Sequence, residues 1–228
     1  MRKLAILAFL LLLVTGCGQS NPFDRIARSV ANEPEYLIIL DDMREEGTFI
    51  KTYYHRYTIA LGERLQRTDW LQVPKNFYEA HANHLGMALA SKAKDEQPST
   101  TPAPPGYAYV GNPRYGEWRT DSRGTSFWEF YGKYRLLTDL IGLGAGLIYR
   151  RDYDDYSRSR TQGRPYFGGD NQFGTGGRFT RSTKPDFFER RQARQAAQRS
   201  SFGERFNRRF ERSRAPVRVG GGVRGFGK

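Results

Sequence analysis

Residues 36–61 read YLIILDDMREEGTFIKTYYHRYTIAL, and this stretch decides the fold class that the sequence predicts. Tyr36 to Leu40 is an apolar run of β-favouring residues, and Thr48 to Leu61 is a second such run. The residues between them, Arg44 to Gly47, have the composition of a turn. We therefore expect a β-hairpin in this region.

Two helices are expected after the hairpin. Asn76 with Glu79 three residues later is a capping pattern, and the helical spacing of the residues that follow predicts a helix over about residues 77–93. A second capping pattern, Ser126 with Glu129, predicts a helix that ends near Gly142. The sequence thus favours an α+β class: a small domain with a β-hairpin and two main helices, followed by a largely disordered basic tail.

The N-terminus has the organisation of a bacterial lipoprotein signal peptide. A short basic region at Arg2 and Lys3 precedes the apolar run from Leu4 to Val14, which is too short for a bilayer span of roughly 20 residues. The run closes on VTGC at residues 14–17, which resembles the lipobox whose cysteine becomes acylated. The alternative is an ordinary secretory signal followed by a chance cysteine.

We expect residues 1–16 to be a cleaved signal peptide and residues 17–21 to be a tether lipidated at Cys17. Cys17 is the only cysteine, which excludes an internal disulfide and a cysteine metal cluster. Several acyl chains give stable anchoring, since each buried methylene contributes about 0.8 kcal/mol. The expected location is the cell envelope. By resemblance to lipoproteins of two-membrane bacteria, Gly18 favours the periplasmic face of the outer membrane.

The net charge of +13 is concentrated towards the C-terminus. Residues 18–101 carry 10 basic and 12 acidic side chains, residues 102–149 carry 5 and 4, and residues 150–228 carry 20 and 8. The last segment also contains no Leu and no Ile. Because such a segment buries little apolar surface to offset its conformational entropy, we expect residues 150–228 to be disordered in isolation.

The folded part is expected between about residues 22 and 150. Residues 95–106 are rich in Pro, Ser and Thr, which predicts an extended linker between a hairpin-plus-helix lobe (22–94) and an aromatic-rich segment (107–149). We interpret the dense Tyr and Trp residues of the latter as a small core, with a binding platform as the alternative.

The residues most typical of an enzyme are Glu79, His81 and His84. Two histidines three residues apart on a helix share a face and could reach one metal ion. Metal sites usually need a third protein ligand and hydrogen-bond partners that orient the ligands, and only His55 remains among the histidines. We interpret them as half-buried histidines and expect a non-catalytic protein without a cofactor. A small envelope metal-binding protein or metal-dependent enzyme is the alternative. The acid pairs at 41–42 and 45–46 are interpreted as a solvated hairpin end.

Two capping patterns in the tail predict helices near residues 187–199 and 202–212. In the second, a phenylalanine repeats every four residues among arginines. The candidate surface-binding residues are Phe202, Arg205, Phe206, Arg208, Arg209, Phe210 and Arg212. This pattern is typical of a helix that lies on an anionic surface, and a solvated coil is the alternative. The expected partners are the membrane, through lipid on Cys17, and anionic lipid, glycan or an envelope protein, but no nucleic acid.

The segments GNPRYGEW (residues 111–118) and SFWEFYGKY (residues 126–134), together with a terminal Gly-Phe-Gly, give the chain a family resemblance. It resembles a group of uncharacterised bacterial envelope lipoproteins, over about residues 36–150 and the final tail. The resemblance implies an envelope location and supplies no catalytic residues.

Overall fold

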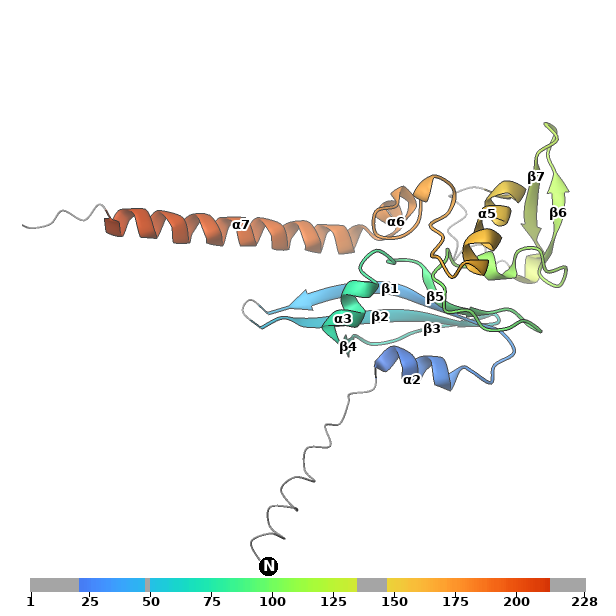
Figure 1. The fold of residues 1–228 in the computed structure, drawn as a ribbon, viewed down its shortest axis with the longest axis horizontal. Helices are drawn as coiled ribbons and strands as arrows, with labels where there is room; N and C mark the ends of the chain where they lie inside the picture. Colours follow the sequence, from blue (N-terminus) through green and yellow to red (C-terminus); the bar gives the residue numbers. More distant parts are fainter. Residues whose placement is uncertain (1–20, 48–49, 135–146, 214–228) are drawn as a thin grey trace, which may run out of the picture. The chain divides into compact units, whose positions relative to one another are not determined.

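The computed structural model describes residues 21–47, 50–134 and 147–213, with the side chains described up to residue 200. The chain divides into two units, residues 1–184 and residues 185–228. The first unit contains two β-sheets and several short helices, and the second contains one long helix (Figure 1).

The first unit is built on a five-stranded antiparallel sheet. Its strands are β1 (Tyr36–Glu46), β2 (Thr52–Leu61), β3 (Arg64–Arg67), β4 (Leu71–Val73) and β5 (Ala88–Lys92). The order is β3-β2-β1-β5, and β4 also pairs with β2. β1 and β2 form the predicted hairpin, with Leu37 opposite Ala60 and Glu46 opposite Thr52. The α+β class is thereby confirmed.

Both faces of β1 are covered, which explains its continuous apolar run. Helix α2 (Pro22–Ser29) lies on one side of the sheet (Figure 1), and its Phe23 ring lies 5.7 Å from the ring of Tyr57 in β2. Leu37 and Ile39 point to the opposite face, where they pack in a core cluster with Tyr115. A strand buried on both sides needs apolar residues at successive positions.

The predicted helix over residues 77–93 is wrong beyond its first turns. Helix α3 is short (Lys75–Ala80), and Ala88 to Lys92 form strand β5 against β1. The loop between them is held from far along the chain. Thr175 donates a hydrogen bond from its hydroxyl to the Ala82 carbonyl (2.6 Å) and from its backbone N–H to the Asn83 carbonyl (3.0 Å). Tertiary contacts therefore override the helical spacing.

A second antiparallel sheet contains β6 (Gly116–Thr120), β7 (Ser126–Phe130) and β8 (Ile148–Tyr149), in that order. The helix predicted from Ser126 is therefore wrong at its start. Trp118 and Trp128 are opposite each other in the ladder, and this aromatic pairing stabilises a strand pair. The part of that predicted helix from residue 135 to about Gly142 lies outside the described residues.

The Pro-rich residues 95–106 do not separate two lobes. The segment is extended and lies along β5, where Ser99 bridges to Ser91 and Ala103 bridges to Ala88. Ala103 is buried. The linker expectation is therefore corrected: this segment is part of one continuous unit.

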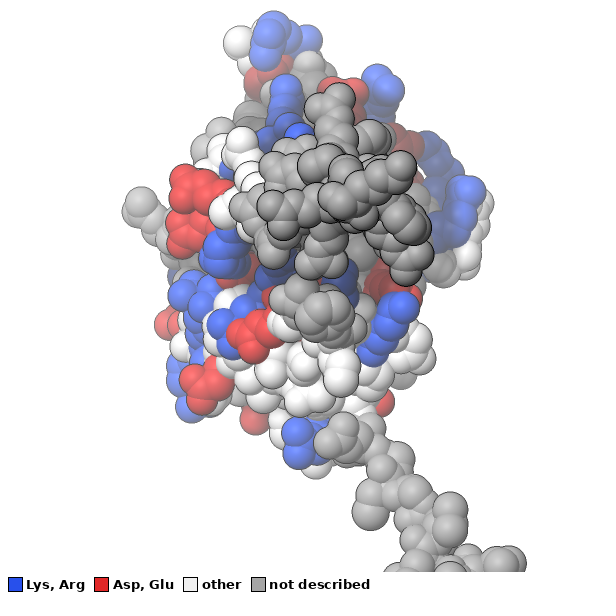
Figure 2. Space-filling model, turned by 90° about the vertical axis from the view of Figure 1, so that its left-hand side faces the viewer, with Lys and Arg blue, Asp and Glu red and all other residues white. Residues whose placement is uncertain are grey.

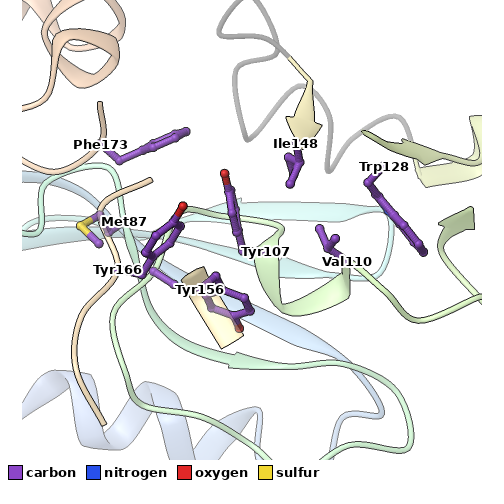
Figure 3. Packing of buried hydrophobic residues seen from close by; sticks show 9 residues of the cluster. Met87, Tyr107, Val110, Trp128, Ile148, Tyr156, Tyr166 and Phe173 are labelled. Carbon is purple, nitrogen blue, oxygen red and sulfur yellow. The ribbon is translucent and has the colours of Figure 1, made fainter. Parts of the chain in front are cut away.

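Residues 150–184 belong to the folded unit, so the basic tail begins later than predicted. They form α5 (Arg150–Thr161) and α6 (Arg178–Thr183). Tyr156, Tyr166 and Phe173 of this segment belong to one buried cluster with Tyr107 and Trp128 (Figure 3). The expected aromatic core is thus confirmed, and it is larger than expected because it includes rings from beyond residue 150.

Candidate functional site

The predicted lipidation site, Cys17, lies outside the described residues. Within the residues that are described, no helix is both long and apolar enough to cross a bilayer.

The second unit contains helix α7 (Pro185–Ser213), 29 residues long. At 1.5 Å per residue it extends about 43 Å. The two predicted helices, 187–199 and 202–212, are therefore helical but continuous with each other. The side chains of Phe202, Phe206, Phe210 and the arginines between them lie outside the described side chains. The expected phenylalanine stripe stays a prediction based on their spacing.

The described part of α7 is exposed and basic. From residue 189 to residue 200, every side chain is exposed apart from the half-buried Arg194. The whole helix has eight arginines and four acidic residues. A helix that is polar on most sides gains little from packing. Over its described side chains, α7 therefore presents a long, exposed and positively charged surface.

All three histidines of the chain gather in one aromatic cluster of the first unit. The ring centroids of His55 and His81 are 6.4 Å apart, and those of His81 and His84 are 5.5 Å apart. The ring of Phe77 lies 4.3 Å from that of His81, and Phe167 stacks on His84 with 5.7 Å between centroids. His55 comes from strand β2, and the spacing of His81 and His84 does not predict that it joins them.

Burial keeps two of these histidines neutral. His55 is fully buried, and its Nδ1 lies 3.0 Å from the Tyr57 hydroxyl. Burial, with a smaller effect from His81, lowers the pKa of His55 to about 3 and the pKa of His84 to about 4. Nε2 of His55 and Nδ1 of His84 have no hydrogen-bond partner among the described residues.

The structure does not bring Glu79 to the histidines. Its carboxylate pairs with Lys75 at 3.6 Å, and its side chain is 60% exposed. His81 follows the last residue of α3 and its Nδ1 lies 2.9 Å from the Phe77 carbonyl oxygen. The part of the chain that is described holds no group of three or more His, Cys, Asp or Glu positioned to hold a metal ion.

A buried ion network surrounds Asp41. A β-bulge between Leu40 and Asp42 interrupts the β1–β2 register at this residue. Arg56 Nε lies 3.0 Å and Arg67 Nε 3.2 Å from Asp41 Oδ2, while Lys184 donates a hydrogen bond to Asp41 Oδ1. The interpretation of this acid pair as a solvated hairpin end is wrong, because Asp41 and Asp42 are both buried.

The positive charges around Asp41 outweigh the effect of burial on the pKa of its carboxyl group. Burial by itself raises the pKa of Asp41, but the hydrogen bond and positive charge of Lys184, together with Arg67 and Arg56, hold that pKa below its usual value. The ring of Trp70 lies close to the guanidinium groups of Arg44 and Arg56, of which Arg56 belongs to the network. The guanidinium carbons of Arg44 and Arg56 are 4.3 Å and 4.9 Å from its ring centroid.

The ion pairs of this network include both carboxylates of the acid pair. Each carboxylate is matched by cations, and Arg56 also bonds Asp42 at 3.3 Å. No signal in the sequence relates Lys184 to Asp41, which precedes it by 143 positions.

Comparisons with protein-family models, with curated proteins and with solved structures find no match to this chain. Fold and function are therefore inferred from its own residues.

Proposed function

We propose that this chain is a lipid-anchored, non-catalytic protein of the cell envelope. In this proposal Cys17 fixes the mature protein to a membrane, and the cationic helix α7 contacts an anionic envelope component. That component is anionic lipid, glycan or an acidic protein surface. The observation that carries the proposal is α7 itself, a continuous, arginine-rich helix whose side chains from residue 189 to residue 200 are exposed apart from that of Arg194.

The distribution of charge supports a distinct role for the second unit. Residues 185–228 have twelve basic and four acidic side chains, whereas residues 22–184 have 23 basic and 20 acidic ones. On the face shown in Figure 2, blue and red side chains are interspersed where the surface is drawn in colour. The second unit therefore holds most of the positive charge that attracts a polyanion.

A weak contact is sufficient for a tethered protein. An anionic membrane surface attracts each nearby Lys or Arg by about 1 kcal/mol, and salt screens this attraction within a Debye length of about 8 Å at physiological ionic strength. The lipid on Cys17 raises the local concentration of α7 near the envelope, so that even low intrinsic affinity gives high occupancy. Binding that weakens as salt is added is expected.

Anchoring is tested by inhibiting lipoprotein processing and by changing the cysteine. Globomycin is expected to make a larger precursor accumulate, and Cys17→Ser is expected to move the protein out of the membrane fraction. A precursor of unchanged size, together with a Cys17→Ser form that fractionates with membranes as the parent does, would contradict the proposal.

Contact by α7 is tested on the full chain with the arginines of its second half changed. Arg205, Arg208, Arg209 and Arg212 are replaced together by Gln. In flotation with vesicles containing phosphatidylglycerol, the parent is expected to bind more than the variant. A matched control replaces four exposed arginines of the first unit by Gln and is expected to bind as the parent does; these are Arg25, Arg64, Arg119 and Arg123. Equal loss in both variants would point to overall charge instead of α7.

A further inference from the structure

The end of the β1–β2 hairpin carries the most exposed large apolar side chain among the described residues. Ile50 is 86% exposed, whereas the three that follow it are 46%, 44% and 40% exposed (Leu65, Leu147 and Tyr131). A single apolar residue on a surface is ordinary, so exposure by itself does not identify a contact. What distinguishes Ile50 is its place in the fold relative to the N-terminus.

The hairpin turn holds Ile50 at the end of the sheet. Strand β1 ends at Glu46 and strand β2 begins at Thr52. Gly47 has a φ of 86°, and a side chain there would meet the Ile50 carbonyl oxygen at 2.0 Å from its Cβ. Only glycine fits in such a close approach of two backbone segments. We call Gly47 and residues 50–52 the hairpin tip.

Helix α2 begins at its end nearer to the hairpin tip and runs away from it (Figure 1). The first turn of α2 is fixed to the sheet, because the ring of Phe23 lies 5.7 Å from the ring of Tyr57 in β2. Tyr57 follows Thr52 by five positions, which is about 17 Å along a strand. The start of α2 and the tip are therefore separated by a distance of this order.

The proposed tether has a similar reach. The five steps from Cys17 to Pro22 span at most about 18 Å when the chain is fully extended. A membrane that holds Cys17 is therefore always within about 18 Å of the start of α2. Because α2 is packed against the sheet, this short tether keeps the first unit close to the membrane, and the hairpin tip is within reach of the bilayer surface.

The charged side chains next to the tip are paired with one another. The pairs are Lys51 with Glu45 at 2.8 Å, Arg44 with Glu46 at 3.1 Å, and Lys75 with Glu79 at 3.6 Å. Three positive and three negative charges cancel. Paired charges approach an apolar medium at a lower cost than unpaired ones. A contact made by this end of the hairpin is therefore expected to be apolar and not to require anionic lipid.

A row of aromatic side chains lies behind the tip. Tyr53 and Tyr54 follow it directly in β2, and Tyr53 also lines a hollow of about 580 Å³ next to Ile50. The ring of Trp70 lies 4.3 Å from the guanidinium carbon of Arg44, the residue opposite Tyr54 in β1. All three rings are half-buried. Tyr and Trp are enriched at membrane–water interfaces, where their rings lie at the level of the headgroups.

We propose that the hairpin tip inserts Ile50 into the interface of the membrane that holds the lipid anchor. Ile50 then enters the boundary between headgroups and acyl chains, and the rings of Tyr53, Tyr54 and Trp70 lie near the headgroups. One isoleucine has weak affinity for a bilayer, but the anchor raises the local concentration of the tip, so a weak contact is sufficient. This inference rests on the anchoring proposed above and is independent of the contact by α7.

The test places a fluorescent label at residue 50 of the full-length protein isolated from its membrane. Cys17 is the only cysteine, and acylation blocks its thiol, so Ile50→Cys supplies the only free thiol. The labelled protein is reconstituted into phosphatidylcholine vesicles, with and without a spin-label quencher attached to the acyl chains. Leu65→Cys is the matched control, because Leu65 is also exposed and lies in β3, which pairs with the other end of β2.

Quenching at residue 50 is expected to exceed quenching at residue 65 by at least about twofold. Equal quenching at the two positions, with Cys17 acylated, would overturn this inference and leave the anchor in place. A label at residue 50 whose emission is shifted to the blue, but which the lipid-bound quencher does not reach, would also overturn it, because another protein surface would then cover the tip. A label found on Cys17 would overturn the anchor and this inference with it.

Two substitutions test the same contact without a label. Ile50→Ser makes the tip polar and Ile50→Leu keeps it apolar, and neither is expected to shift the melting temperature by more than about 2 °C, because the side chain is 86% exposed. On vesicles, trypsin is expected to cleave after Lys51 at least about threefold faster in Ile50→Ser than in Ile50→Leu. Cleavage after Arg64, at the other end of β2, is the internal reference. Equal rates after Lys51 in the two variants would overturn the inference.

Discussion

Lys184, the residue that precedes helix α7, donates a hydrogen bond to the buried carboxylate of Asp41 in strand β1. This contact closes the folded unit at its last residue and ties that end of the unit to the central hairpin. The second unit begins at the next residue. The ion network around Asp41 thus holds the last residue of the first unit.

Replacing Asp41 by Ala is expected to destabilise the protein by about 3–5 kcal/mol, because three basic side chains lose their shared buried partner. The free energy of unfolding is measured by urea denaturation. The control Asp69→Ala removes an exposed carboxylate that joins no ion pair among the described residues, and a change within about 0.5 kcal/mol is expected there. Equal losses in the two variants would mean that the network contributes no special stability.

Stability is expected to fall as the pH drops from about 6.5 towards 5. The folded pKa values of His55 and His84, about 3 and about 4, lie below the usual histidine value of 6.5, so the unfolded chain binds more protons in this range. Each histidine contributes up to about 2 kcal/mol of this loss at pH 5. The pKa of Asp41 is lowered from 3.8, so its contribution is lost only at more acidic pH.

His55→Leu is expected to flatten the stability curve between pH 6.5 and pH 5 relative to the parent. Urea unfolding at a series of pH values measures the effect, whatever the absolute stability of the variant. An unchanged pH slope in His55→Leu would show that His55 is not the buried neutral group inferred from its surroundings.

Removing metal is expected to leave the protein unchanged. Glu79 is turned away from His81 and His84, and the described residues offer no third ligand. Dialysis against a chelator should therefore not alter the melting temperature. Stoichiometric zinc in the purified protein, lost on changing both histidines to Ala, would contradict this expectation and favour the metal-binding alternative.

A peptide of residues 185–214 is expected to gain helix on anionic vesicles. Gly203 in the helix interior costs about 1 kcal/mol relative to Ala, and the peptide lacks apolar packing in water. Far-UV circular dichroism should show more helix with phosphatidylglycerol vesicles than with phosphatidylcholine vesicles. A spectrum that is the same with both lipids would remove the preference for an anionic surface.

The hairpin and the aromatic core were predictable from local sequence. β1 and β2 are rich in apolar and β-favouring residues along their own lengths. The closely spaced aromatic residues between 107 and 128 contribute to a buried cluster, as expected. The capping pattern at Ser126 misled because the same residues alternate as a strand once β6 pairs with them. Helix α3 ends early because its following loop is bonded to Thr175, which local spacing cannot reveal.

The end of the folded unit was not predictable from composition. Residues 150–184 lack Leu and Ile, yet their rings complete a core supplied by earlier segments, and a buried aromatic side chain removes about 150–250 Å² from water. Both residues 150–184 and residues 185–228 lack Leu and Ile, so composition does not distinguish the folded segment from the tail. The partners of Asp41 are distant from it in sequence, so they became visible only in the structure.

The central claim is that the mature protein begins at an acylated Cys17. Mass spectrometry of the N-terminal proteolytic peptide, from protein isolated with its native membrane, tests it directly. The account predicts a peptide that begins at Cys17 and carries the added mass of acyl chains. A peptide that begins at Met1 or beyond Cys17, or one with an unmodified cysteine, would contradict it.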